Sequence, residues 1–189
     1  MDEKQKKRLL WQVPFLTLLI IGTVLIIRQQ HNMPYQRYSD FVFGTTFTVT
    51  YQCDSDMSQS IKAELMKVDY SLSPFNKESV ITAINNNEDV KPDKMFMDVF
   101  QLAMDVSRET DGAFDITVAP LVNAWGFGFK SGEKPTARQV VSLRQIIGYQ
   151  KITVDHGKIR KQDPRMMLDC SAIAKGYGSD VVARLLRSH

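Results

Sequence analysis

Residues 110–128 read TDGAFDITVAPLVNAWGFG, and this stretch interrupts an otherwise periodic sequence. The positions before it carry apolar residues at helical spacing, and the pair Asp111-Gly112 ends that pattern. Residues 113–134 have no clear period and are rich in aromatic residues and glycine, so we expect a loop there. Asp115 follows a tight turn, where a turn carboxylate or helix cap and a site carboxylate both fit.

Working outward, apolar residues at helical spacing predict four helices, over residues 54–72, 79–84, 93–109 and 136–147. Ser79 is the expected N-cap of the second. The third is expected to bury one apolar face, consisting of Met95, Val99, Leu102 and Val106.

Strand periodicity appears in residues 41–51, with an interruption at Gly44, and residues 149–161 predict a hairpin that turns at 155–157. In the first segment the apolar side chains share one parity, which predicts one buried face for Phe41, Phe43, Phe47, Val49 and Tyr51. Strands and helices mix without a βαβ order. The predicted fold class is therefore α+β, with a mixed or antiparallel sheet and flanking helices.

Residues 9–27 read LLWQVPFLTLLIIGTVLII and contain no charged side chain. As a helix they span roughly 28 Å, close to the thickness of a bilayer core. The basic cluster of residues 4–8 precedes the run, which predicts a cytoplasmic N-terminus and a following domain on the extracytoplasmic side of the inner membrane. A cleaved signal peptide and a buried core helix are the alternatives, but the run ends without a small-x-small cleavage pattern. We divide the chain into an anchor (1–30), a linker (31–37) and one domain (38–189).

Composition excludes several classes of function. The net charge of +3 owes much to the N-terminal cluster, so the exported part lacks the basic face of a nucleic-acid-binding protein. The three histidines are scattered and the two cysteines, Cys53 and Cys170, lie far apart, which argues against a zinc site. Their spacing does not decide whether the two cysteines pair.

A last segment, residues 168–180, reads LDCSAIAKGYGSD. We expect a strand that ends at Asp169 and a helix that begins near Lys175. A helix N-terminus with a nearby lysine suits phosphate, whereas tight packing of small residues around a solvated lysine is the alternative. In the earlier loop, aromatic residues alternate with other residues and either stack on a planar ligand or fill the core: Trp125, Phe127 and Phe129.

Three segments in this order and spacing resemble the ApbE family of FAD:protein FMN transferases: SPFNKESVITAIN from residue 73, TDGAFDITVAPLVNAWGFG from residue 110, and LDCSAIAKGYGSD from residue 168. The resemblance extends from about residue 38 to the last residue. It implies Mg²⁺-dependent transfer of FMN from FAD to a threonine hydroxyl of a target protein, with release of AMP.

By motif position, the resemblance implies a set of FAD-contacting residues: Phe43, Phe75, Ala113, Phe114, Asp115, Asp169 and Lys175. Phe75 stands where a flavin-stacking tyrosine is frequent, and the backbone carbonyl of Ala172 would be a Mg²⁺ ligand. Mg²⁺ prefers oxygen ligands, and a metal ion and a lysine can neutralise the charge that develops when a pyrophosphate breaks.

The resemblance also implies partners, which are exported flavin-acceptor domains of membrane redox complexes. Family members continue for roughly as long again and carry most Mg²⁺ ligands in that second half, so we expect a truncated domain. Two alternatives to the transferase remain: an inactive membrane-tethered FAD-binding fragment, and an FAD pyrophosphatase that produces FMN and AMP.

Overall fold

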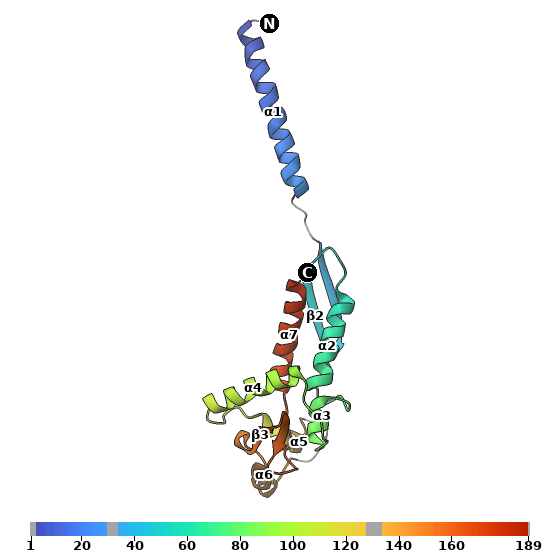
Figure 1. Ribbon diagram of the computed structural model, residues 1–189, viewed down its shortest axis with the longest axis vertical. Helices are drawn as coiled ribbons and strands as arrows, with labels where there is room; N and C mark the ends of the chain where they lie inside the picture. The colour runs from blue at the N-terminus through green and yellow to red at the C-terminus, as the bar shows by residue number, and fades with distance from the viewer. Residues whose placement is uncertain (1–2, 30–33, 128–133, 189) are drawn as a thin grey trace.

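The structure is a computed structural model that describes residues 3–29, 34–127 and 134–188. Figure 1 shows one long N-terminal helix standing apart from a single folded domain. The helices and strands in chain order are α1 (Glu3–Gln29), β1 (Tyr35–Val42), β2 (Thr45–Gln52), α2 (Ser58–Leu72), α3 (Val80–Asn85), α4 (Lys94–Glu109), η1 (Ile116–Val118), α5 (Ala119–Ala124), α6 (Ala137–Arg144), η2 (Tyr149–Lys151), β3 (Ile152–Asp155), β4 (Lys158–Lys161) and α7 (Ser171–Arg187).

Helix α1 contains a stretch long and apolar enough to cross a membrane, Trp11–Arg28, with a mean hydropathy of 1.8. None of that stretch is buried by the rest of the protein. By length and composition it qualifies as a membrane span, although an N-terminal signal sequence has the same properties.

The first hairpin pairs β1 with β2, and Val42 lies opposite Thr45. The two residues between them, Phe43 and Gly44, have φ angles of 55° and 71°, so the strands are joined by a type I′ turn. The segment predicted as one interrupted strand thus contains the end of β1, the turn and most of β2, and β1 already includes positions 35–37 of the predicted linker.

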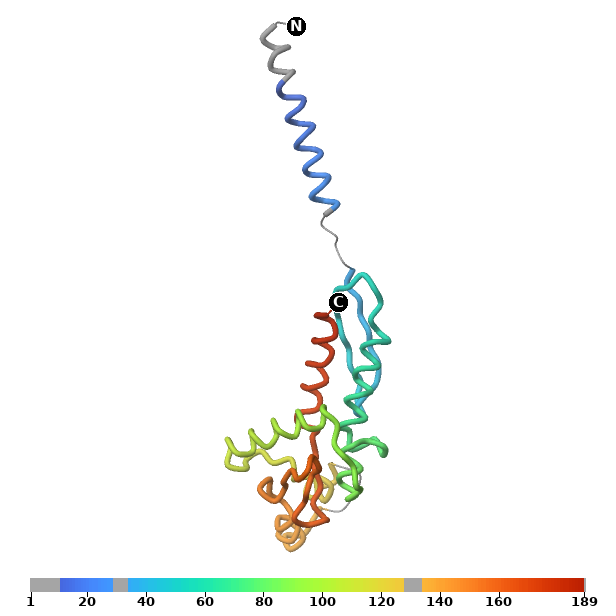
Figure 2. Tube along the Cα trace, viewed as in Figure 1, coloured from blue at the N-terminus to red at the C-terminus, as the bar shows by residue number. Residues whose placement is uncertain are grey.

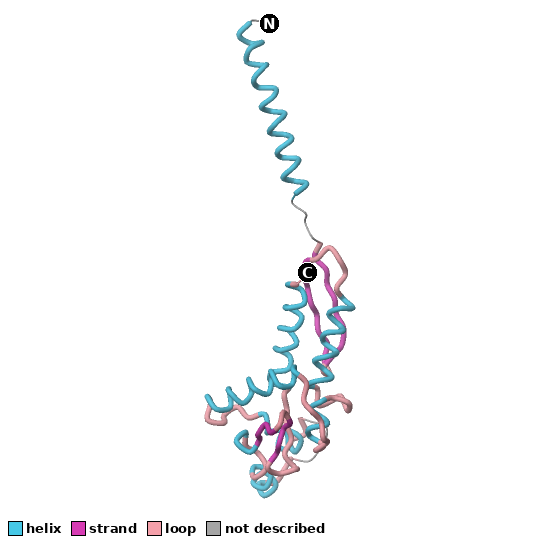
Figure 3. The backbone as a smooth tube through the Cα atoms, viewed as in Figure 1, coloured by secondary structure: helices cyan, strands magenta, loops and turns pink. Residues whose placement is uncertain are grey.

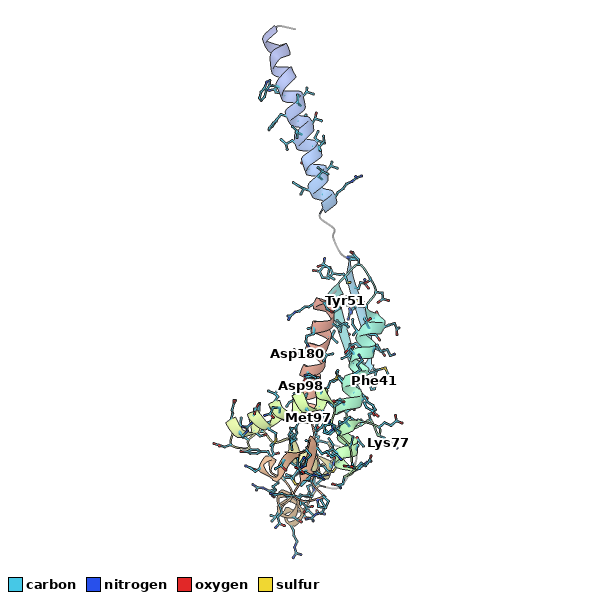
Figure 4. The ribbon with its side chains drawn as sticks, in the orientation of Figure 1. Phe41, Tyr51, Lys77, Met97, Asp98 and Asp180 are labelled. Carbon is cyan, nitrogen blue, oxygen red and sulfur yellow. The ribbon has the colours of Figure 1, made fainter. Side chains whose placement is uncertain are left out.

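The inward face of this hairpin changes parity at the turn. Even-numbered residues of β1 and odd-numbered residues of β2 are the less exposed ones. The prediction that Phe41 is buried is therefore wrong, because its side chain is 64% exposed on the outer face, whereas Tyr51 is buried. Figure 4 labels both residues, one near each end of the hairpin.

Helices α2 and α7 run side by side along the hairpin (Figure 2). A small core cluster lies between these three elements, and its buried members are Tyr51, Met57, Ile61, Leu65 and Val182. The spacing Ile61, Leu65 and Val68 put these side chains on one face of α2, as predicted.

A larger core cluster joins the far ends of α2 and α7 to α3, α4 and the second hairpin. Ser79 caps α3 by accepting from the backbone N–H of Thr82, as predicted. Helix α4 has nearly the predicted bounds, but the predicted face is only partly right. Val99 is buried, whereas Leu102 is 51% exposed, because the buried stripe follows Phe96, Phe100 and Ala103.

Two further predictions are corrected (Figure 3). The expected loop at 113–134 contains η1 and α5 within its described part, and Pro120 lies in the first turn of α5. The expected strand before Asp169 does not form. The backbone of Leu168 bonds instead to the side chain of Asn85, which donates to its carbonyl at 2.9 Å and accepts from its N–H at 2.7 Å.

The α+β fold class is confirmed, and its sheets are two separate antiparallel pairs, β1–β2 and β3–β4, within the described part of the chain. The second hairpin lies where the sequence placed it, with its turn at His156-Gly157.

Candidate functional site

Three segments that are distant in sequence meet at the turn of the first hairpin. They are the turn itself, the loop of residues 73–76 and the start of α7. Together with the end of α2 they line a small cavity of about 30 Å³, whose walls are Phe43, Leu72, Ser73, Pro74, Phe75, Ser171, Ala174 and Lys175. A longer open groove of about 450 Å³ between β2 and α7 begins at the same place, because Phe43 and Lys175 line both.

The loop of residues 73–76 is held by its own polar groups. The amide of Asn76 donates to Asp69 at 2.9 Å, and the hydroxyl of Ser79 donates to the carbonyl of Ser73 at 2.7 Å. Between these anchors the ring of Phe75 is 56% exposed. An exposed aromatic ring on a braced loop is well suited to stack on a planar ligand.

Helix α7 begins at Ser171, one turn earlier than predicted. Its first donors are already used: the N–H of Ser171 donates to the carboxylate of Asp169 at 2.7 Å, and the N–H of Ala174 donates to Cys170 at 2.8 Å. The helix start therefore offers less to a phosphate than the sequence suggested. Asp169 acts in this structure as a local cap.

Lys175 is the fifth residue of α7 and is exposed. Among the residues that the structure describes, its ammonium has no hydrogen bond or ion pair. A cation without a protein partner, beside the aromatic rings of Phe43 and Phe75, is available for an anionic ligand.

Asp115 has a full set of partners inside the protein. Its carboxylate accepts from the N–H of Thr117 at 2.8 Å, the hydroxyl of Thr117 at 2.7 Å and the N–H of Tyr149 at 2.8 Å. These bonds cap η1 and tie it to η2. These bonds favour the interpretation of Asp115 as a helix cap over its interpretation as a site carboxylate.

The other predicted residues of this segment lie outside the small cavity. Ala113 is exposed, and Phe114 packs against the larger core cluster. The segment nevertheless runs beside the start of α7, since the N–H of Asp169 donates to the carbonyl of Ile116 at 2.7 Å. The structure thus brings Phe43, Phe75 and Lys175 together at the cavity. Residues 113–115 do not line it, but the segment that follows them is joined to Asp169 by a backbone hydrogen bond.

The aromatic residues after α5 are not core residues. Trp125 is 47% exposed and Phe127 is 82% exposed, which removes the core-filling interpretation for Phe127. Phe129 lies outside the described residues.

Metal-binding groups are sparse in the described ranges, which contain no set of three His, Cys, Asp or Glu residues able to hold a metal ion. Ala172 is the second residue of α7, so its carbonyl faces the N–H of Gly176 within the helix. Both cysteines are free thiols, and burial raises the pKa of Cys170 to about 12. The described residues thus do not by themselves form the magnesium site that the resemblance implies.

Sequence reasoning missed two features of the site. Ser171 and Ala174 line the cavity although neither carries a distinctive signal. Gly178 lies where α7 approaches Phe43, and its place inside a helical pattern is the signal that could have revealed this close approach.

This chain is similar in sequence to a known family and to known proteins. A model of the ApbE family matches residues 43–189. The FAD:protein FMN transferase of Haemophilus influenzae is 36% identical over 160 residues, which cover 76% of this chain and 46% of that protein. The FAD:protein FMN transferase of Vibrio cholerae is 30% identical over 189 residues, covering 94% of this chain and 55% of that protein.

Solved structures agree. The flavin transferase ApbE from Vibrio cholerae superposes with a TM-score of 0.75 at 31% identity, covering 82% of this chain and 54% of that one. The flavinyl transferase ApbE from Pseudomonas stutzeri, in its apo form, gives a TM-score of 0.74 at 26% identity, covering 84% and 54%. The chain spans about half the length of the relatives that it matches.

Proposed function

The chain belongs to the ApbE family, and from that premise we propose that it serves in flavin transfer, with FAD as substrate and a protein as acceptor. In the reaction that we propose, the FMN half of FAD passes to a threonine hydroxyl of the target, and AMP is released. The observation that carries the proposal is the meeting of Phe43, Phe75 and Lys175 at one cavity.

The side chains at this cavity match the parts of FAD. The exposed ring of Phe75 suits an isoalloxazine, which is planar and aromatic. The ammonium of Lys175, which has no partner among the described residues, suits the diphosphate, because a mobile cation can follow negative charge as it moves to the leaving group.

The proposed step balances as a phosphoryl transfer. The threonine oxygen forms a bond to the FMN phosphorus, and the bond between that phosphorus and the bridging oxygen breaks. AMP leaves with the bridging oxygen and its electron pair, while the hydroxyl proton passes to a base that we do not assign. In this step Lys175 binds and neutralises the diphosphate.

Magnesium dependence is part of the proposal by family resemblance alone. Among the described residues, the one Mg²⁺ ligand that the resemblance implies is the carbonyl of Ala172, and one carbonyl is far from the near-octahedral shell of Mg²⁺. We therefore assign no step to the metal, and keep the other proposed FAD contacts, Ala113, Phe114, Asp115 and Asp169, as predictions.

We further propose that α1 is an uncleaved anchor in the inner membrane and that the domain lies on its extracytoplasmic side. The proposed division is an anchor at 1–30 and a domain from 38, with the linker of 31–37 shortened by the start of β1 at Tyr35. The tether would raise the effective concentration of the domain near exported flavin-acceptor domains of membrane redox complexes.

The direct test is to incubate the full chain in lipid nanodiscs with FAD, Mg²⁺ and an exported domain that carries an acceptor threonine. We expect flavin fluorescence on the acceptor that survives denaturation, together with free AMP. FMN and AMP with an unlabelled acceptor would instead identify an FAD pyrophosphatase, and FAD binding without either product would identify a binding fragment.

Lys175→Ala is expected to weaken FAD affinity by about tenfold, because the diphosphate loses its cation. The control is Lys94→Ala in α4, another exposed lysine, whose ammonium pairs with Asp98 at 2.7 Å and does not line the cavity. Titration of FAD fluorescence measures both. Equal FAD affinities for the two variants would show that Lys175 is a solvated surface residue that does not bind FAD.

A further inference from the structure

Gly178 occupies a helix interior, where glycine is normally disfavoured relative to alanine. It is buried, in the middle of α7. The same helix contains Gly176, two residues earlier, so the two glycines offer a direct comparison of what each position requires.

Space around the two glycines differs. A Cβ atom at Gly178 would lie 3.2 Å from Cε2 and 3.5 Å from Cζ of Phe43, and 3.4 Å from Cδ2 of Leu65. A Cβ atom at Gly176 would have nothing within 4 Å. Only at 178 does the absence of a side chain make room for another residue.

The residue that comes closest to this space is Phe43, whose backbone is constrained at the hairpin turn. Phe43 has a φ of 55°, a conformation that a bulky L-residue rarely adopts, and the pairing of Val42 with Thr45 holds the backbone on both sides. Its ring contacts both core clusters. Because the backbone is held, an added methyl group at 178 presses first on the Phe43 ring, which is its nearest neighbour, and then on the side chain of Leu65.

The ring stands at a junction. Phe43 lines the small cavity with Phe75 and Lys175, and it also lines the groove between β2 and α7. A shift of a few tenths of an ångström away from α7 therefore changes the shape of the surface that meets a ligand at the cavity.

We propose that Gly178 is a positioning residue for flavin binding: its missing side chain sets the place of the Phe43 ring beside Phe75 and Lys175. The inference rests on the proposed function, since it takes FAD as the ligand that meets the side chains around this cavity and the adjoining groove. It predicts that residue size at 178 controls FAD affinity through Phe43, although residue 178 lines only the adjoining groove.

The test compares Gly178→Ala with Gly176→Ala in the full chain in nanodiscs. Both changes give α7 the same gain in helix propensity, so the difference isolates the contact with Phe43. We expect Gly178→Ala to bind FAD about five- to tenfold more weakly than Gly176→Ala, a coupling of the size found between residues in contact. Gly178→Val against Gly176→Val is expected to widen the difference.

A double-mutant cycle with Phe43→Leu shows whether the effect passes through the ring, because leucine lacks the atoms that approach residue 178. In that background, alanine and glycine at 178 are expected to differ in FAD affinity by less than about twofold. Thermal unfolding of each variant separates affinity from stability.

Each outcome decides the inference. Equal FAD affinity for Gly178→Ala and Gly176→Ala, with tight binding by the wild type, would overturn it and leave the proposed function intact. A lowered melting temperature at 178 with unchanged affinity would also overturn it, since Gly178 would then serve packing alone. Absence of FAD binding by the wild type would overturn the proposed function, and this inference with it.

Discussion

The two hairpins of this protein have turns of the same length and backbone geometry, and they differ in the surroundings of the turn side chains. Each is an antiparallel pair closed by two residues with positive φ, Phe43-Gly44 in the first and His156-Gly157 in the second. In both, a glycine takes the second position and a larger residue the first. The type I′ geometry matches the right-handed twist of the strands and needs a positive φ at both turn positions, which favours asparagine and glycine.

The first turn residue has opposite surroundings in the two hairpins. The side chain of His156 is 92% exposed, whereas that of Phe43 packs against both core clusters. A left-handed conformation costs an L-residue about 1–2 kcal/mol. At His156 the exposed side chain makes no core contact, while at Phe43 the ring joins the core to the candidate site. The same turn is a chain reversal in one hairpin and a structural part of the site in the other.

The largest expected difference between the two turns comes from placing asparagine, a favoured type I′ residue, at the first position of each. Phe43→Asn is expected to lower the free energy of unfolding by about 2 kcal/mol, since lost ring contacts outweigh the relieved strain. His156→Asn is expected to change it by less than about 0.5 kcal/mol. Chemical denaturation of the full chain in nanodiscs measures both. A stabilised Phe43→Asn variant would show that the ring contributes little.

The glycines at the second positions of the two turns give a smaller expected effect. Gly44→Ala and Gly157→Ala are each expected to cost about 1 kcal/mol, because both need a left-handed backbone. Added Cβ atoms would meet Phe75 at 3.9 Å and Lys91 at 3.7 Å, which are ordinary contacts. FAD affinity is expected to fall only for Gly44→Ala. Similar FAD affinity in the two variants would place the first turn outside the site.

The smallest expected effect concerns the ion pair that joins each hairpin to the segment beside it. Lys62 lies 2.8 Å from Asp40 of β1 and, together with a hydrogen bond from Tyr38, holds the pKa of that carboxyl well below its ordinary value of 3.8. Lys158 of β4 lowers the pKa of Asp89 in the same direction.

A lowered folded pKa contributes stability above the ordinary pKa of the carboxyl, and that stability is lost as the pH falls through the folded value. We therefore expect the wild type to lose stability below about pH 4. Asp40→Asn should flatten this loss more than Asp89→Asn, because Asp40 also accepts from Tyr38 and from the N–H of Phe41. Melting temperatures between pH 3 and 7 measure the difference. The reverse ranking would mean that the extra bonds to Asp40 do not persist in solution.

Local signals predicted much of the framework. The cap Ser79 and the spacing of Ile61 and Leu65 gave the correct helices, because capping and face formation depend on residues within one or two turns. The buried face of α4 was only partly predicted, because which stripe of a helix is covered depends on its neighbours. The strand expected before Asp169 failed for a similar reason, since the distant Asn85 takes the hydrogen bonds of Leu168.

By itself, the sequence determined the α+β class, the apolar N-terminal helix and the family, because composition, periodicity and motif order are properties of the chain. The family resemblance of the sequence also suggested candidate residues for the site, which stay predictions. Only the tertiary structure decided which of them meet. Phe43, Phe75 and Lys175 share a cavity, while Asp115 is used as a cap. The reason is physical: hairpin register and helix contacts bring distant segments together, and a two-residue turn reverses the parity of a strand's buried face.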